Sequence, residues 1–221
     1  MSDDVERYIV CNGDADGLCA ALQWRWHDPR PATLITGLKR DVELLRRVPP
    51  TSAREVVVFD LSMPRNARAL TALLEHGVNV RYFDHHAANT PVRHPRLQAH
   101  LDSHANVCTC VLVDRYLHGA RRAWAVVGAW GDNLASGARR LARLAELSND
   151  QCETLRMLGE AINYNAYGDT EADVLIAPAR LYDLLASYRD PLDAAAREPV
   201  VAQLMARQAD DLRQAKQTAT Y

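Results

Sequence analysis

The sequence predicts an α/β fold: an open parallel sheet with helices on both faces, followed by a helix-rich C-terminal half. Two observations predict it. Up to about residue 83, short runs rich in β-branched and aromatic residues alternate with stretches of helical periodicity. The runs 8–10 and 56–59 are apolar at consecutive positions, as expected of strands that are covered on both faces. In such a sheet, ligands bind at the carboxyl ends of the strands.

The expected elements follow from these periodicities. We expect strands at 8–11, 32–36, 55–59 and 78–83, and helices at 18–26, 41–48 and 64–75. The second half predicts helices at 109–117, 123–130, 137–147, 150–163, 179–187 and 200–217. Prolines punctuate the tail, so we divide the chain into a main domain, 1–175, and a helical extension, 176–221, that connects toward a second domain.

Composition excludes several classes of protein. The chain has 221 residues, of which 48% are hydrophobic, which is enough to bury a core. Its formal net charge of −2 provides no general attraction for a polyanion, so any nucleic acid must be bound locally. The five cysteines lack the paired spacing of a zinc site or a disulfide framework. An acidic N-terminus and the lack of a long apolar run predict a cytoplasmic protein without a membrane partner.

Acidic residues follow the predicted strands, where a parallel sheet brings its loops together. Asp14, Asp16, Asp60 and Asp84 each lie at or just past such an end. Carboxylates so close together need either raised pKa values or bound cations, and the neighbouring pair His85–His86 favours cations, because imidazole is a common metal ligand. The segment 12–17 also resembles the start of an EF-hand loop. That alternative fails because a strand precedes the segment and its twelfth position is a glutamine.

Four motifs together resemble those of the DHH phosphoesterase superfamily. They are Asn12-Gly-Asp14-Ala-Asp16-Gly17, Val58-Phe59-Asp60, Asp84-His85-His86 and Gly131-Asp132, in this order. The resemblance covers about residues 7–170 and implies a DHH-type catalytic domain over 1–175. The superfamily includes single-strand exonucleases of the RecJ kind, oligoribonucleases, cyclic-dinucleotide phosphodiesterases and pyrophosphatases. Nothing after residue 170 resembles the glycine-rich second domain that many members carry.

The resemblance also implies a site with two Mn²⁺ ions, with Mg²⁺ as an alternative. One ion would lie on Asp14 and Asp60, with Asn12 beside it, and Asp60 would bridge to the second. That second ion would lie on Asp16, Asp60, His85 and Asp132. His86 would stand beside the scissile phosphate, and Asp84 would be a carboxylate of the metal site or one that orients a histidine. Asn12 departs from the commonest pattern, which has a histidine there, and so predicts a weaker first ion.

Other residues are candidates for binding substrate. Lys39 and Arg40 follow the second strand and suit a phosphate. Thr109 begins a helix that residues 106–109 would cap, and its donors can also face the metals. Residues 163–168 are either a helix end closed by a glycine or a platform for a base or ribose, with Asn165 as the candidate contact.

The sequence therefore predicts a metal-dependent phosphoesterase of the phosphodiesterase or exonuclease type. Two metal ions would activate water to hydrolyse short single-stranded nucleic acids or related nucleotides, and no protein nucleophile is needed. A catalytically weakened binding or scaffold module, and a pyrophosphatase or polyphosphatase, are the alternatives. The oligomeric state is open, with a homodimer as one alternative.

Overall fold

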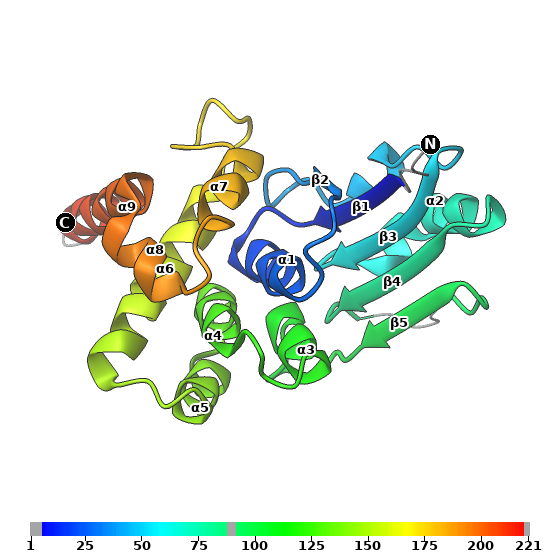
Figure 1. Ribbon diagram of the computed structural model, residues 1–221. Coiled ribbons are helices and arrows are strands. Elements are labelled where there is room, and N and C mark those ends of the chain that lie inside the picture. Colours follow the sequence, from blue (N-terminus) through cyan, green and yellow to red (C-terminus); the bar gives the residue numbers. More distant parts are fainter. Residues whose placement is uncertain (1–5, 88–91, 219–221) are drawn as a thin grey trace.

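The computed structural model describes residues 6–87 and 92–218. Within these residues, five parallel strands form one sheet in the order β2-β1-β3-β4-β5 (Figure 1). The strands are β1 (Glu6–Cys11), β2 (Thr33–Ile35), β3 (Ala53–Phe59), β4 (Asn79–Asp84) and β5 (Leu97–Leu101). The order places β1 and β3 side by side with β4 next, so the loops after these three strands share one edge. The predicted parallel α/β sheet is confirmed.

Helices cover both faces of the sheet, and two apolar cores result. On one face, Val56 and Val58 of β3 pack toward α2 (Met63–Glu75). On the other face, Val57 and Phe59 pack toward α1 (Ala15–His27) and α3 (Thr109–Tyr116). Because successive strand residues point to opposite faces, the uninterrupted apolar run of β3 serves both cores.

The remaining helices extend the core on the α1 side. Figure 1 shows them to the left of the sheet, beyond α1. Buried residues of α4, α6 and α9 belong to the same apolar core as those of α1. These helices are α4 (Arg122–Gly131), α5 (Ala135–Leu144), α6 (Asn149–Asn165), α7 (Pro178–Leu185), α8 (Pro191–Arg197) and α9 (Pro199–Thr218). None of the helices in the described ranges is both long enough and apolar enough to cross a bilayer.

Three local expectations differ from the structure. The helix predicted at 41–48 is only a short 3₁₀ turn, η1 (Leu44–Arg47). Asn66 of α2 accepts a hydrogen bond from the Leu45 amide and donates one to the Val42 carbonyl, so it satisfies groups that a helix would pair internally. Strand β5 is an edge strand with no fully buried residue, and its sequence lacks the apolar run of a central strand. Helix α8 is seven residues long, too short for a clear periodicity.

Candidate metal centre

The acid-rich turn 12–17 joins β1 to α1 and places two carboxylates at the carboxyl edge of the sheet. Asp14 is the N-cap of α1, and its Oδ1 accepts a hydrogen bond of 3.0 Å from the Gly17 amide. Asp16, in the first turn of α1, accepts 2.7 Å hydrogen bonds from the amides of Thr109 and Cys110. Asp16 therefore caps the first turn of α3 from a distant part of the chain, which ties the acid-rich turn to that helix.

Asp60 follows β3 in an unusual backbone conformation. Its φ is +57°, in the left-handed region that Asp tolerates better than most residues. The Asp60 amide still donates to the Phe83 carbonyl at 3.0 Å, as a further rung of the ladder between the strands. The Thr109 hydroxyl donates to Asp60 Oδ1 at 3.2 Å. The turn thus directs the Asp60 carboxylate into the same cleft as the acid-rich turn.

Three carboxylates surround the Nε2 atom of His85. This nitrogen lies 3.4 Å from Asp60 Oδ1 and 3.9 Å from both Asp16 Oδ2 and Asp132 Oδ2. The other ring nitrogen, Nδ1, donates to the Val107 carbonyl at 3.1 Å, because a carbonyl oxygen only accepts. In the neutral ring, Nε2 therefore turns its lone pair toward three carboxylates. This donor set fits a divalent cation, since electron pairs that face one another need a positive charge between them.

Asp84 and His86 form a separate pair, and His86 is the member of the pair that lines the cleft. Asp84 is fully buried, and its Oδ1 accepts from His86 Nδ1 at 2.6 Å and from the His86 amide at 3.1 Å. Its Oδ2 accepts from the Met63 amide at 3.3 Å. The His86 ring is 47% exposed, so Nε2 can meet a ligand. The hydrogen bond to Asp84 raises the pKa of His86 above its ordinary value.

The buried carboxyls of the cluster interact unfavourably with one another. Burial, reinforced by Asp14 and Asp16, raises the pKa of Asp60 well above that of an ordinary carboxyl. Burial and Asp16 raise the pKa of Asp132 to about 7, although His85 opposes the shift. A divalent cation bound among these carboxylates would displace protons and offset the same repulsion.

Within the described ranges, donor atoms that lie within 4.8 Å of one another form two groups. One is Asp60 with His85 and His86, and the other is Asp16 with Asp132 and Cys108. A thiol is a softer ligand than the carboxylates, which suit Mn²⁺ and Mg²⁺ better. The predicted residues 16, 60 and 132 lie within 3.9 Å of His85 Nε2. Asp14 is near enough to Asp60 to raise the pKa of that carboxyl.

Asn12 and Lys39 make direct contacts with Asp14. The Lys39 ammonium is 2.8 Å from Asp14 Oδ2 and 3.1 Å from Asn163 Oδ1. Asn12 Oδ1 accepts from the Asp14 amide at 3.1 Å, and Asn12 Nδ2 donates to the Lys39 carbonyl at 3.2 Å. The first predicted ion site thus already has polar partners from within the chain.

A cleft of about 410 Å³ opens over these residues. Ser62 and Arg65, which belong to none of the sequence motifs, also line it. Both lie at the start of α2, shortly after Asp60. The sequence signal for them is a helix that begins directly after an aspartate at a strand end. Arg65 is exposed and brings a positive charge to the cleft. The residues predicted from the sequence that line the cleft are Asn12, Asp14, Lys39, Asp60, His85, His86 and Asp132.

Three substrate-binding predictions have other surroundings. Thr109 is fully buried, and its hydroxyl and amide are bonded to Asp60 and Asp16. Arg40 forms an ion pair with Asp169 on the surface. Asn165 is buried and its amide holds the loop at Leu175 and Ile176, so it does not line the cleft. Helix α6 ends at Asn165 with Ala166 as its cap, and the glycine at 168 is not the closing residue.

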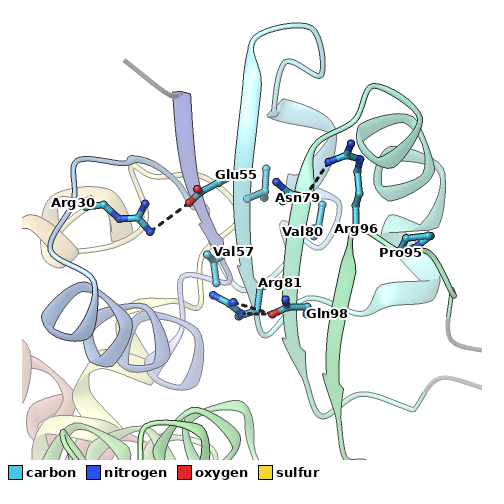
Figure 2. A pocket seen from close by; sticks show the side chains of 10 residues that line it. Arg30, Glu55, Val57, Asn79, Val80, Arg81, Pro95, Arg96 and Gln98 are labelled. Carbon is cyan, nitrogen blue, oxygen red and sulfur yellow. Dashed lines mark hydrogen bonds and ion pairs between the residues drawn. The ribbon is translucent and has the colours of Figure 1, made fainter. Parts of the chain in front are cut away.

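A second hollow, of about 240 Å³, lies near the beginnings of β3, β4 and β5 (Figure 2). Its arginines point toward partners within the hollow: Arg81 hydrogen-bonds Gln98, and Arg96 hydrogen-bonds Asn79. The guanidinium of Arg81 also lies 5.0 Å from the ring centroid of Trp24. This hollow contains none of the residues that the sequence motifs identify.

Several solved structures have the same fold as this chain. They include the exonuclease RecJ bound to manganese, with 20% identity, 93% of this chain and 62% of that chain covered, and a TM-score of 0.57. RecJ from Thermus thermophilus in complex with Mn²⁺ matches with 20% identity, 93% and 35% coverage and a TM-score of 0.50. The DHH domain of a member of a ribosomal protein family matches with 15% identity, 94% and 58% coverage and a TM-score of 0.55.

These matches show that the chain shares its fold with RecJ and with a DHH domain, which confirms the resemblance at the level of the fold. The chain spans less than two thirds of the length of each of these structures. No family model and no curated protein matches the sequence.

Proposed function

We propose that the cleft at the carboxyl edge of the sheet is the active site of a metal-dependent phosphoesterase. Its substrates would be short single-stranded oligonucleotides or related nucleotides, whose phosphodiester bonds it hydrolyses. The proposal depends on one observation: carboxylate oxygens of Asp16, Asp60 and Asp132 all lie within 3.9 Å of His85 Nε2. The likeness in fold to a manganese-bound exonuclease supports it and favours Mn²⁺ as the ion.

Each side chain has a role that its contacts support. Asp16, Asp60, His85 and Asp132 would hold the ion. When bound, a divalent ion supplies a water of lowered pKa and offsets the charge of the phosphate. His86 is held by Asp84 so that its Nε2 faces the cleft, and its raised pKa favours the protonated ring. The ring would donate that proton to a phosphate oxygen or to the leaving group.

Positive charges at the cleft suit an anionic substrate. Lys39 and Arg65 line it, and both are cationic at neutral pH. The net charge of the whole chain is negative, so this local charge is what would attract a phosphate. Short substrates fit the size of the cleft better than a long duplex, which needs a broad basic surface.

The test is a hydrolysis panel with the full chain in Mn²⁺. It compares dinucleotides, longer single strands, cyclic dinucleotides, pyrophosphate and polyphosphate. We expect release of mononucleotides from the short oligonucleotides. Asp60→Asn should lose activity by a factor of at least about a hundred, because the amide removes a central charge while tolerating the left-handed backbone. Asp193→Asn, at an exposed ion pair on α8, is the matched control and should keep full activity.

A binding module without turnover is the second candidate, and the contacts of Asn12 and Asp14 favour it. Their polar atoms are already hydrogen-bonded within the chain. Fluorescence anisotropy of a labelled dinucleotide, measured with Mn²⁺ beside the hydrolysis panel, separates the two. Tight binding with no product identifies the module, and product formation that Asp60→Asn abolishes identifies the enzyme. Failure of every substrate, with no bound Mn²⁺, would refute the proposed enzyme.

A further inference from the structure

Asn12 and Asp14, which are expected to hold the first of two metal ions, already have each side-chain oxygen engaged within the chain. Asp14 Oδ1 accepts from the Gly17 amide at 3.0 Å, and its Oδ2 is 2.8 Å from the Lys39 ammonium. The side-chain oxygen of Asn12 accepts from the Asp14 amide at 3.1 Å. This oxygen is the atom with which an asparagine side chain ordinarily ligates a hard cation. The amide donors leave a second lone pair on each of these oxygens. A metal ion on Asp14 Oδ2 would, however, have to displace the Lys39 ammonium.

The orientation of the Asn12 amide follows from its two neighbours. Its oxygen faces an N–H group and its nitrogen faces the carbonyl oxygen of Lys39. Turning the amide over would place donor against donor and acceptor against acceptor, so the assignment is determined by the hydrogen bonds. A carboxylate at this position would repel the Lys39 carbonyl. An asparagine at position 12 is therefore compatible with the Lys39 carbonyl beside it, because its Nδ2 donates to that carbonyl.

Lys39 itself is held by several contacts. Its amide donates to the Ala166 carbonyl at 3.1 Å, and its ammonium donates to Asn163 Oδ1 at 3.1 Å, so both groups attach to the end of α6. The ammonium also lies 5.3 Å from the ring centroid of Tyr167. These contacts hold the Lys39 ammonium next to Asp14.

We propose that the Lys39 ammonium takes the place of one of the two divalent ions, so that the centre holds a single ion on Asp16, Asp60, His85 and Asp132. This inference rests on the proposed function, because it concerns the ion content of the same cleft. The disagreement between the expected two-ion site and the ion pair of Lys39 with Asp14 carries it. The carboxylates of the cleft differ accordingly: those of Asp16, Asp60 and Asp132 surround His85 Nε2, whereas that of Asp14 faces the Lys39 ammonium.

The replacement has a chemical consequence. An ammonium can neutralise Asp14 and attract a phosphate oxygen, but it cannot coordinate a water as a metal ion does. Activation of water would therefore depend on one ion and its carboxylates. Lys39 would contribute charge and positioning at the other side of the phosphate.

The test counts the ions on the full, metal-stripped chain. Isothermal titration with MnCl₂ should give one tight equivalent for the wild type, and electron paramagnetic resonance should give the spectrum of an isolated Mn²⁺ ion. Lys39→Met removes the charge but keeps a long apolar stem, so Asp14 is left as an unpaired buried carboxylate. This variant should take up a second equivalent and give a spectrum of exchange-coupled ions.

Two further variants control the experiment. Lys39→Arg keeps a positive charge and should stay at one equivalent, and Arg197→Met, which removes an exposed charge on α8, should also stay at one. Two equivalents with coupled spectra in the wild type would overturn the inference and leave the proposed function standing. One equivalent in both the wild type and a folded Lys39→Met would also overturn it, since Lys39 would then exclude nothing. No bound Mn²⁺ at all would instead count against the proposed function.

Discussion

At the scale of single residues, the carboxylates of the cleft differ in what else they do. Asp16 uses both oxygens to accept amides of α3, at 2.7 Å each. Asp84 accepts from three groups that include the His86 ring. Asp60 accepts from one hydroxyl and is repelled by the carboxylates of its neighbours. Substitution of Asp16 therefore disturbs the packing of α3 as well as the ion, whereas Asp60 reports on the ion more cleanly.

The Asp84–His86 pair leads to a prediction about titration. Asp84→Asn keeps the shape of the side chain but removes the charge that the His86 ring faces at 2.6 Å. We expect the pKa of His86 to fall, because the hydrogen bond from His86 to Asp84 is the largest cause of its raised value. NMR titration of the metal-free protein measures this shift. An unchanged His86 titration in Asp84→Asn would contradict the pairing, and Asp193→Asn should leave the titration as in the wild type.

Loss of His86 or of its partner Asp84 should impair the proposed reaction. Removal of a positioned proton donor costs about 100- to 10,000-fold in rate in typical enzymes, so His86→Ala should lose activity in that range. Asp84→Asn, which leaves the ring but weakens its orientation, should lose less. In Asp84→Asn the His86 ring releases its proton at a lower pH than in the wild type. The alkaline limb of the pH–rate profile should therefore shift to lower pH. Equal activity of His86→Ala and the wild type would remove His86 from the mechanism.

At the scale of elements, the position of Asp132 depends on close contact between helices. Asp132 is the C-cap of α4, and the residue before it, Gly131, faces α1 and α6. A methyl group on Gly131 would lie 2.2 Å from Ala15 Cβ and 2.9 Å from the Gly159 carbonyl oxygen. Real side chains do not approach so closely, so only glycine allows α4 to bring Asp132 next to the acid-rich turn.

Gly131→Ala should therefore harm both stability and ion binding. Overpacking of this kind costs about 1–3 kcal/mol, and each kcal/mol lowers the melting temperature by roughly 2–4 °C in a chain of this size. Mn²⁺ affinity should fall as well, because α1 and the end of α4 carry two of the proposed ligands. Thermal unfolding and Mn²⁺ titration measure the two effects.

Gly137→Ala on α5 is the matched control. A methyl group there has its nearest neighbour at 3.7 Å, and alanine favours a helix more than glycine does. This variant should be neutral or stabilising and should bind Mn²⁺ as the wild type does. Equal behaviour of Gly131→Ala and Gly137→Ala would contradict the role of the close contact.

Much of the fold was predictable, and the exceptions have physical reasons. The central strands were predicted because their apolar runs are buried on both faces, as β3 is. Strand β5 could not be found in the same way, since it lies at the sheet edge and none of its residues is fully buried. The helix expected at 41–48 failed because Asn66, distant in sequence, supplies its hydrogen-bond partners. Helix α8 had a usable signal in Asp190, which caps it and precedes a proline.

The site was predictable where the sequence motifs name its residues. Asp16, Asp60, His85 and Asp132 converge as the motifs imply. The contact between Lys39 and Asp14 was not predictable, because it joins segments 25 residues apart and depends on the end of α6. The same holds for the role of Asp16 as a cap for α3, which links residues 93 apart.

At the scale of the whole molecule, the buried carboxyls couple stability to pH. Without metal, burial raises the pKa of Asp132 to about 7 and that of Asp60 well above its ordinary value. The folded state then binds more protons than the unfolded state above the ordinary carboxyl pKa of about 4, so stability falls as pH rises toward 7. The raised pKa of His86 acts in the same direction. Carboxyls with lowered pKa, such as Asp28, lose their stabilisation only at lower pH.

The metal-free protein in EDTA should therefore melt at a lower temperature at about pH 7.5 than at about pH 5. Mn²⁺ binds the deprotonated carboxylates of the folded state, so its stabilising effect should be larger at the higher pH. Differential scanning calorimetry with EDTA or MnCl₂ at both pH values measures this. Asp132→Asn should reduce the pH dependence. A Mn²⁺ effect that is equal at both pH values, or larger at about pH 5, would contradict the assignment.

The position of the ion can be measured directly. Crystals of the full chain soaked in MnCl₂, with anomalous diffraction recorded on both sides of the manganese absorption edge, show where Mn²⁺ binds. We expect one strong anomalous peak, in contact with His85 Nε2 and the carboxylates of Asp16, Asp60 and Asp132, and none beside Asp14 and Lys39. A crystal that binds no Mn²⁺ among these four residues would refute the proposed metal centre.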